Sequence, residues 1–184
     1  MKTFILVLII FLSVLSNTAT AGDGMEFRFF GINPADFKDR NPIKVVIGGF
    51  ASHIVHEMGH VVIGNMLDMD TEYDFADRVV YSNDYDNSTN SEKTLFHAGG
   101  FIATTIVGTV ITSIPATRHS DYTLGFNGFS AIHDTMYGLT GGLNDEQYSD
   151  VHNLDNLGQD GTAIALTSGV YAGILTYISA NKVK

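Results

Sequence analysis

Three long apolar stretches, at residues 43–67, 94–117 and 161–180, most strongly constrain how this chain can fold. Each is about as long as the ~20 residues that a helix needs to cross ~30 Å of hydrocarbon. Small residues recur in all three, as in GGFIATTIVGT and ALTSGVYAG, and they allow the backbones of membrane helices to approach closely. We therefore expect an all-α, polytopic helical membrane protein with about three core transmembrane helices. The alternative is a soluble helical domain that buries the same three helices.

The composition agrees with a membrane protein and excludes other classes. Hydrophobic residues make up 45% of the 184 residues and charged residues only 16%, whereas an average soluble domain has about 25% charged residues. The formal net charge of -10 argues against nucleic acid as a partner, because Lys and Arg neutralise phosphates in such complexes. Cysteine is absent from the sequence, so any chemistry depends on His, Asp and Glu.

Residues 1–21 have the pattern of a signal peptide. Lys2 gives a positive start, residues 4–15 form an apolar core, and ATA at residues 19–21 is a small-x-small cleavage pattern. The apolar core is short for a membrane span. We therefore expect cleavage before Gly22 rather than an uncleaved anchor helix.

The rest of the chain divides into an exported amino-terminal segment, residues 22–42, and a membrane-embedded domain, residues 43–184. Two polar regions, at residues 68–93 and 118–160, separate the apolar stretches, and we expect them to form loops. Within the first of them, TEYDFADRVVYS at residues 71–82 can pair as short strands.

Basic residues flank the outer apolar stretches on both sides, so the positive-inside rule favours neither orientation strongly. They are Arg28, Lys38, Arg40 and Lys44 before or at the start of the first stretch, and Lys182 and Lys184 after the last. An exported amino end followed by three spans leaves the carboxyl end in the cytoplasm, and we expect this topology. The protein is then an integral component of the cell inner membrane or an equivalent membrane, with membrane lipid as a partner.

The middle of the first apolar stretch carries HEMGH, at residues 56–60, which is the zincin pattern. On a helix His56 and His60 lie about 40° apart, so both imidazoles can bind one metal ion. Glu57 can take a proton from a water molecule that attacks a carbonyl group. An ionisable residue in the middle of a membrane helix costs at least ~2.5 kcal/mol, and metal binding explains why this helix tolerates such residues. Nitrogen and oxygen ligands favour zinc, and we expect one Zn²⁺ ion per chain.

Two histidines leave a zinc ion without its usual third protein ligand. Spacing alone does not decide among the candidates, which are Asp160, His97, Glu92, Asp155, His133 and His152. His53 precedes His56 by about one helical turn and extends the same polar stripe. It is a candidate for a hydrogen bond to a ligand, for stabilising a transition state, or for a simple interior contact.

These motifs resemble the site-2 protease family of intramembrane zinc metalloproteases. That family has H-E-x-x-H on one core transmembrane helix, a small-residue element on the next and an Asp-Gly pair on a third. Here HEMGH at residues 56–60, AGGFIA at 98–103 and NLGQDGTAIA at 156–165 follow in the same order. Gly100 stands where the family commonly has proline, and the Asp-Gly pair has Asn156 before it but no proline.

The resemblance implies roles for individual residues. His56, His60 and Asp160 would hold the zinc ion, and Glu57 would be the general base. His97, His53 and Asn156 are auxiliary candidates. The implied activity is that of a zinc metalloprotease that hydrolyses a peptide bond in or near the bilayer, with a peptide or a membrane protein as substrate. A site this small is also consistent with an accessory protein as a partner.

Two other functions compete with proteolysis. The first is a membrane protein that binds or transports metal without hydrolysis, and further residues of the metal-binding types motivate it: His97, His119, His133, Asp134, His152 and Asp155. The second is a helical structural or assembly protein whose histidines only form hydrogen bonds. Glu57 discriminates between proteolysis and metal binding, because hydrolysis requires a general base and binding does not.

Overall fold

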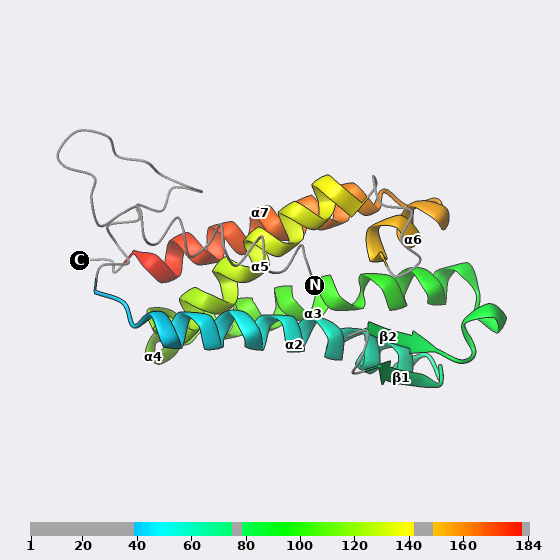
Figure 1. Ribbon diagram of the computed structural model, residues 1–184, viewed down its shortest axis with the longest axis horizontal. Coiled ribbons are helices and arrows are strands. Elements are labelled where there is room, and N and C mark those ends of the chain that lie inside the picture. The colour runs from blue at the N-terminus through cyan, green and yellow to red at the C-terminus, as the bar shows by residue number, and fades with distance from the viewer. Residues whose placement is uncertain (1–38, 75–78, 142–148, 182–184) are drawn as a thin grey trace.

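Four long helices form an antiparallel bundle in the computed structural model of the chain (Figure 1). The structure describes residues 39–74, 79–141 and 149–181. The signal peptide expected at residues 1–21 and most of the segment at 22–42 lie outside them. The bundle consists of α2 (Pro42–Met66), α3 (Asn90–Ser113), α5 (Asp121–Thr140) and α7 (Gly161–Ala180). The described chain is therefore mostly helical, in agreement with the all-α expectation.

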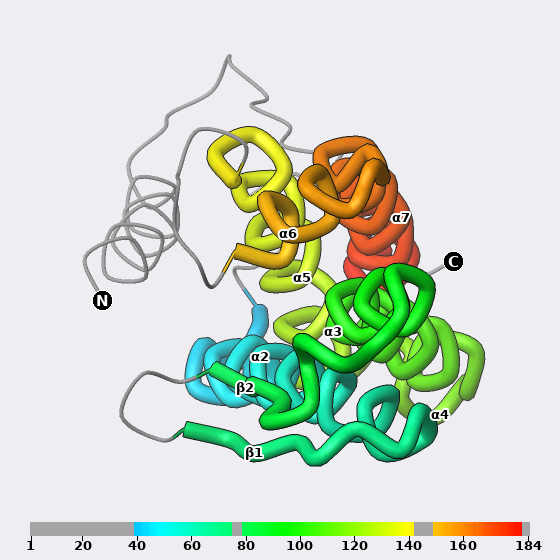
Figure 2. The backbone as a smooth tube through the Cα atoms, turned by 90° about the vertical axis from the view of Figure 1, so that its right-hand side faces the viewer, coloured from blue at the N-terminus to red at the C-terminus, as the bar shows by residue number. Residues whose placement is uncertain are grey.

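Short elements connect the long helices. Strand β1 (Thr71–Asp74) pairs antiparallel with β2 (Val79–Ser82), which confirms the expectation that the segment TEYDFADRVVYS contains paired short strands. The 3-10 turn η2 (Tyr85–Asn87) follows this hairpin, and α6 (Asp150–Asn156) precedes α7. The hairpin, η2 and α6 lie at one end of the bundle, whereas α4 (Pro115–Arg118) lies at the other (Figure 1). Figure 2 shows the bundle from the end that carries α6, which packs against α3 and α7.

Capping groups and proline set the limits of the helices. The side chain of Asn41 accepts hydrogen bonds from the first amides of α2, and Thr89 and Glu92 form a capping box at the start of α3. Such a cap stabilises a helix by about 1 kcal/mol. The apolar stretch at residues 94–117 does not continue as one helix, because Pro115 keeps Ile114 in an extended conformation.

The region at residues 118–160 is not a polar loop, contrary to the expectation from the sequence. It contains α5, which packs against both α2 and α7, and α6. Polar residues of α5, among them Asn127, Ser130 and Asp134, are buried within the bundle. The sequence of α5 is less apolar than those of the other long helices because much of its surface contacts polar groups of these helices rather than the outside of the bundle.

The bundle has apolar side chains outside and hydrogen-bonded polar side chains inside. Large apolar residues are exposed along the outer faces of the three apolar helices: Ile47, Phe50, Ile54, Met58 and Val62 of α2, Ile102, Ile106 and Val110 of α3, and Val170 and Ile174 of α7. Extensive apolar surface of this kind is rare on soluble monomers. Among the described residues, α2, α3 and α7 are long and apolar enough to cross a membrane. The outer faces of these helices are therefore compatible with contact with lipid.

Interhelical hydrogen bonds and close backbone contacts join the helices. Ser52 of α2 contacts Ser130 of α5 with 2.6 Å between the hydroxyl oxygens, and Asn127 donates to Thr112 of α3 at 2.8 Å. At the crossing of α2 and α3, a Cβ atom added to Gly59 would overlap the carbonyl of Gly99. The small residues of the apolar stretches therefore serve the close packing that the sequence predicts.

The two ends of the described bundle lie together, whereas a chain with the three spans expected from the sequence would have them on opposite sides of the membrane. Arg40, just before α2, donates to the carbonyl oxygen of Ala180, the last residue of α7, at 2.9 Å. The backbone amide of Asn41 donates to Asp121 at the start of α5 at 3.0 Å. Because α5 adds a fourth long helix to the three expected, the chain returns to the end at which it entered. A bundle that spans a membrane in this form has both of these ends on the same side.

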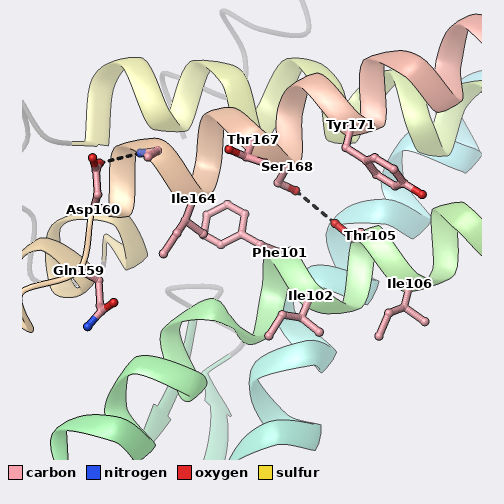
Figure 3. A pocket seen from close by; sticks show the side chains of 11 residues that line it. Phe101, Ile102, Thr105, Ile106, Gln159, Asp160, Ile164, Thr167, Ser168 and Tyr171 are labelled. Carbon is pink, nitrogen blue, oxygen red and sulfur yellow. Dashed lines mark hydrogen bonds between the residues drawn. The ribbon is translucent and has the colours of Figure 1, made fainter.

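A groove of about 670 Å³ lies between α3 and α7 (Figure 3). Its walls are mainly apolar, and Phe101 and Ile164 contribute to them from the two helices. Ser168 and Thr105 lie opposite each other across it, with 3.4 Å between their hydroxyl oxygens. Phe101 also contacts His56, with 5.2 Å between the ring centroids. The groove therefore adjoins the zincin helix.

Candidate metal centre

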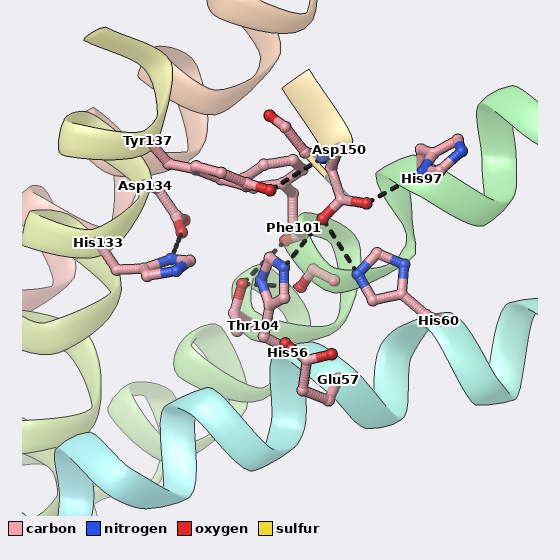
Figure 4. Close-up of polar contacts among 12 residues, drawn as sticks. His56, Glu57, His60, His97, Phe101, Thr104, His133, Asp134, Tyr137 and Asp150 are labelled. Carbon is pink, nitrogen blue, oxygen red and sulfur yellow. Dashed lines mark hydrogen bonds and ion pairs between the residues drawn. The ribbon is translucent and has the colours of Figure 1, made fainter. Parts of the chain in front are cut away.

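The two zincin histidines and Asp150 meet inside the bundle (Figure 4). The Nε2 atoms of His56 and His60 lie 3.4 Å and 3.3 Å from Oδ2 of Asp150. Both imidazoles are buried, and they project from α2 because a spacing of four residues places them on one helix face. Asp150 comes from a different element, the first turn of α6. Two nitrogens and one carboxylate oxygen from distant segments therefore face a common point.

Hydrogen bonds orient these groups. Nδ1 of His60 donates to the carbonyl oxygen of Phe96 at 2.7 Å, because a carbonyl can only accept. In the neutral imidazole this leaves the lone pair on Nε2, as a metal ligand requires. The backbone amide of Asp150 donates to the hydroxyl oxygen of Tyr137 at 2.9 Å. Both the histidine and the carboxylate are thus held before any ion binds.

His97 supports Asp150 from the opposite side. Its Nδ1 lies 3.0 Å from Oδ1 of Asp150, and its Nε2 lies 2.8 Å from the hydroxyl of Tyr85 in η2. Burial alone opposes ionisation of Asp150, but the neighbouring imidazoles of His60, His56 and His97 outweigh it and hold the pKa of that carboxyl well below its usual range. The carboxylate is therefore ionised, which is the form that ligates a metal.

The donor set fits a zinc ion. The ligand atoms of His56, His60 and Asp150 lie within 4.8 Å of one another, and two imidazoles with one carboxylate form a common zinc site in hydrolytic enzymes. In addition, Nδ1 of His56 is buried without a hydrogen-bond partner in the described structure. Buried polar atoms are rarely left in this state, and His56 lacks the orienting hydrogen bond that Nδ1 of His60 has.

Glu57 and His53 lie on α2 next to the ligands. The carboxylate of Glu57 is 16% exposed, and its Oε1 lies 3.8 Å from Nδ1 of His53 one turn earlier. Partial exposure leaves Glu57 accessible to water, which a general base for hydrolysis requires. His53 therefore lies close to the proposed base.

Asp160 does not lie with the histidines, contrary to the expectation that it is the third ligand, and Asp150 lies beside them instead. It is exposed and caps the start of α7, where its carboxylate accepts from the amide of Ala163 at 2.8 Å. Its side chain lines the groove between α3 and α7 (Figure 3). The dipeptide Asp-Gly therefore marks a helix start here rather than a metal ligand.

The remaining candidates also separate into those that reach the site and those that do not. Glu92 caps α3, Asp155 accepts from the amide of Gly161, and Asn156 is exposed at the end of α6. His97 and His133 lie close to the proposed ligands. Asp150 was missed because it falls in a region expected to be a loop. A recognisable signal is the sequence Ser149-Asp150, a helix cap followed by an acidic first residue.

A second group of possible ligands shares His56 with the first. It adds His133 and Asp134 of α5, whose ligand atoms also lie within 4.8 Å of those of His56. However, Oδ1 of Asp134 lies 3.0 Å from Nδ1 of His133, and Oδ2 accepts from Ser168 at 2.7 Å. Oδ2 of Asp150 faces the imidazoles of His56 and His60, whereas Asp134 faces one imidazole and uses its other oxygen for Ser168, so the group with Asp150 is the better metal site.

Comparison of the chain with protein-family models, with curated proteins and with solved structures finds no significant match. The geometry of the site is therefore the basis for a proposal about function.

Proposed function

We propose that this chain is an integral-membrane zinc metalloprotease, similar to the site-2 proteases, that hydrolyses a peptide bond in or near the bilayer. The observation that carries the proposal is the convergence of His56, His60 and Asp150 beside Glu57 in the middle of a bundle. A chance H-E-x-x-H sequence gives no reason for a distant carboxylate to meet both imidazoles. We also propose export of residues 22–42 and residence in the cell inner membrane or an equivalent membrane.

His56, His60 and Asp150 would hold the ion, with His97 fixing the position of Asp150. A bound zinc ion would act as a Lewis acid that makes water more acidic and polarises the carbonyl of the substrate. Glu57 takes a proton from water as the oxygen bonds to the carbonyl carbon. It then passes this proton to the amide nitrogen as the C–N bond breaks, so that one water and one peptide give an acid and an amine.

The surroundings of the site suit an apolar peptide segment. The groove between α3 and α7 is mainly apolar, and one of its lining residues is Phe101, whose ring contacts His56. Polar elements, the hairpin and η2, lie at the end of the bundle nearest to His97 and Asp150. We propose that water reaches Glu57 from this end, while the substrate approaches along the groove.

The first experiment is a measurement of metal content and cleavage on detergent-purified protein. We expect about one zinc ion per chain, lost in His56→Ala, because each ligand contributes to a three-ligand site. Fluorescein-labelled β-casein serves as a general substrate, and Glu57→Gln should retain zinc but lose cleavage. Wild-type protein without metal after chelator-free purification, or cleavage that persists in Glu57→Gln, contradicts the proposal.

The second group of ligands, with His133 and Asp134, favours one alternative function. Two adjacent groups of possible ligands share His56. A metal ion could pass from one group to the other, as a transport protein requires. The discriminating variant is again Glu57→Gln. A transporter should still move zinc across the membrane of proteoliposomes when this residue is changed, whereas a protease should show no zinc flux and should lose cleavage.

A further inference from the structure

A buried carboxylate orients an accessible histidine next to the candidate metal centre. Nδ1 of His133 lies 3.0 Å from Oδ1 of Asp134, whose side chain is 1% exposed. Ser168 of α7 donates to the other carboxylate oxygen at 2.7 Å. Since a carboxylate can only accept, Nδ1 of His133 is the donor. Asp134 is therefore fixed from two helices and determines which ring nitrogen of His133 remains for other contacts.

The ring of His133 extends from α5 towards the centre (Figure 4). It stacks on Phe129 at an interplanar angle of 15°, and it packs against Tyr137 with 5.4 Å between the centroids. Its centroid lies 5.3 Å from that of His56. In contrast to Asp134, the His133 side chain is 31% exposed. Two aromatic rings therefore pack against His133, and its side chain remains partly exposed next to the proposed ligand His56.

We propose that His133 is a further catalytic residue, whose Nε2–H donates a hydrogen bond to the substrate carbonyl oxygen as that oxygen gains negative charge. Asp134 is a positioning residue that acts through His133. The inference rests on the proposed proteolytic function and adds to it a residue on α5 that H-E-x-x-H does not contain.

The chemistry of the pair supports this role. A buried carboxylate requires a compensating positive charge or donors, and His133 and Ser168 supply them. An imidazolium at His133 carries a proton on both ring nitrogens, so Nδ1–H can serve Asp134 while Nε2–H serves the substrate. A donor held in place where charge develops lowers the barrier because it needs no reorganisation during the reaction. The buried pair with Asp134 provides this fixed position.

The test compares His133→Ala, His133→Gln and Asp134→Asn with wild type. His119→Ala is the matched control, because His119 lies at the opposite end of the bundle, where its Nδ1 contacts the carbonyl of Ser179. We expect His133→Ala to keep its zinc and the KM for β-casein but to lose about 10²- to 10³-fold in kcat, as for removal of one oxyanion donor. His133→Gln, whose amide can donate, should recover part of this loss, and Asp134→Asn should lower kcat with zinc retained.

A second measurement does not depend on turnover. Acetohydroxamate is titrated into the cobalt-loaded protein, and its Kd is read from the visible spectrum of the metal. We expect a Kd at least about 10-fold weaker in His133→Ala, equivalent to ~1.4 kcal/mol, and a wild-type Kd in His119→Ala.

Each result has a defined meaning. Loss of zinc in His133→Ala makes His133 a ligand and overturns the inference, as does a wild-type kcat with zinc retained. If wild type binds zinc but does not cleave β-casein, the proposed function fails, and the hydroxamate Kd alone then decides for or against His133 as a donor. If wild type binds no metal, both proposals are wrong.

Discussion

At the scale of single residues, Asp150 connects three imidazoles from two helices. One of its oxygens faces His56 and His60 on α2, and the other faces His97 on α3. A buried carboxylate with several partners is costly to remove, because every partner loses its compensation. The metal centre should therefore be more sensitive to Asp150 than to any other acidic residue of α6 or of the start of α7.

We predict that Asp150→Ala removes zinc from the purified protein, whereas Asp160→Ala leaves it in place. Asp160 only caps α7, so its loss should lower stability by about 1 kcal/mol without changing the metal content. Zinc per chain, measured by mass spectrometry on both variants, checks this. The reverse pattern would restore Asp160 as the third ligand and would show that the arrangement around Asp150 is not the one that binds metal.

Tyr85 provides a milder test of the same network. The change Tyr85→Phe removes only the hydroxyl that lies 2.8 Å from Nε2 of His97, and His97 in turn holds Asp150. We expect zinc affinity to fall by about 10- to 100-fold, the usual effect of losing a group that orients a ligand. Competition with a chelator of known affinity measures it. Tyr81→Phe, which changes an exposed residue of β2 in the same polar region, is the control and should bind zinc as wild type does.

At the scale of elements, the close packing of α3 against α2 shapes the site. Gly100 faces the His56 ring so closely that an added Cβ would overlap its Nε2 and Cε1 atoms. Glycine at this position therefore makes room for the first zincin histidine. The small-residue element AGGFIA is in this way part of the metal centre, although it supplies no ligand.

We predict that Gly100→Ala displaces the His56 ring and lowers peptide cleavage by about 10²-fold, as expected for a misplacement of about 1 Å at a reacting centre. Gly128→Ala on α5 is the matched control, because its nearest neighbour outside the helix backbone is a methyl group at the ordinary distance of 3.6 Å. β-Casein cleavage and thermal unfolding of both variants separate a local effect from general instability. Equal losses in the two variants would show that Gly100 has no special role.

The sequence predicts the elements better than their connections. Hydrophobicity predicts the helices α2, α3 and α7, and H-E-x-x-H marks His56, Glu57 and His60 as candidate site residues. Both signals are local in the sequence. It misses α5, whose buried Asn127 and Asp134 make the helix look like a loop. It also misses Asp150, because a ligand distant in sequence depends on how α6 packs against α3. Local patterns do not contain that information.

At the scale of the whole molecule, the bundle is closed by contacts between its first and last described residues. Arg40 joins the carbonyl of Ala180 to Asp121 at the start of α5, which fixes three helix ends together. The hairpin and α6 occupy the opposite end (Figure 1). With apolar residues over the outer faces of α2, α3 and α7, the arrangement separates two polar ends by an apolar belt.

We predict that residues 39 and 181 face the same side of the membrane and residue 87 the other. The natural chain has no cysteine, so the single variants Asp39→Cys, Asn181→Cys and Asn87→Cys each carry one thiol. With a membrane-impermeant maleimide on intact cells, the first two should react alike and the third oppositely, because four antiparallel helices return the chain to its starting side. Labelling after detergent lysis checks that every thiol can react. Opposite labelling of residues 39 and 181 would instead support three spans, and would mean that α5 does not cross the membrane beside α2 and α7.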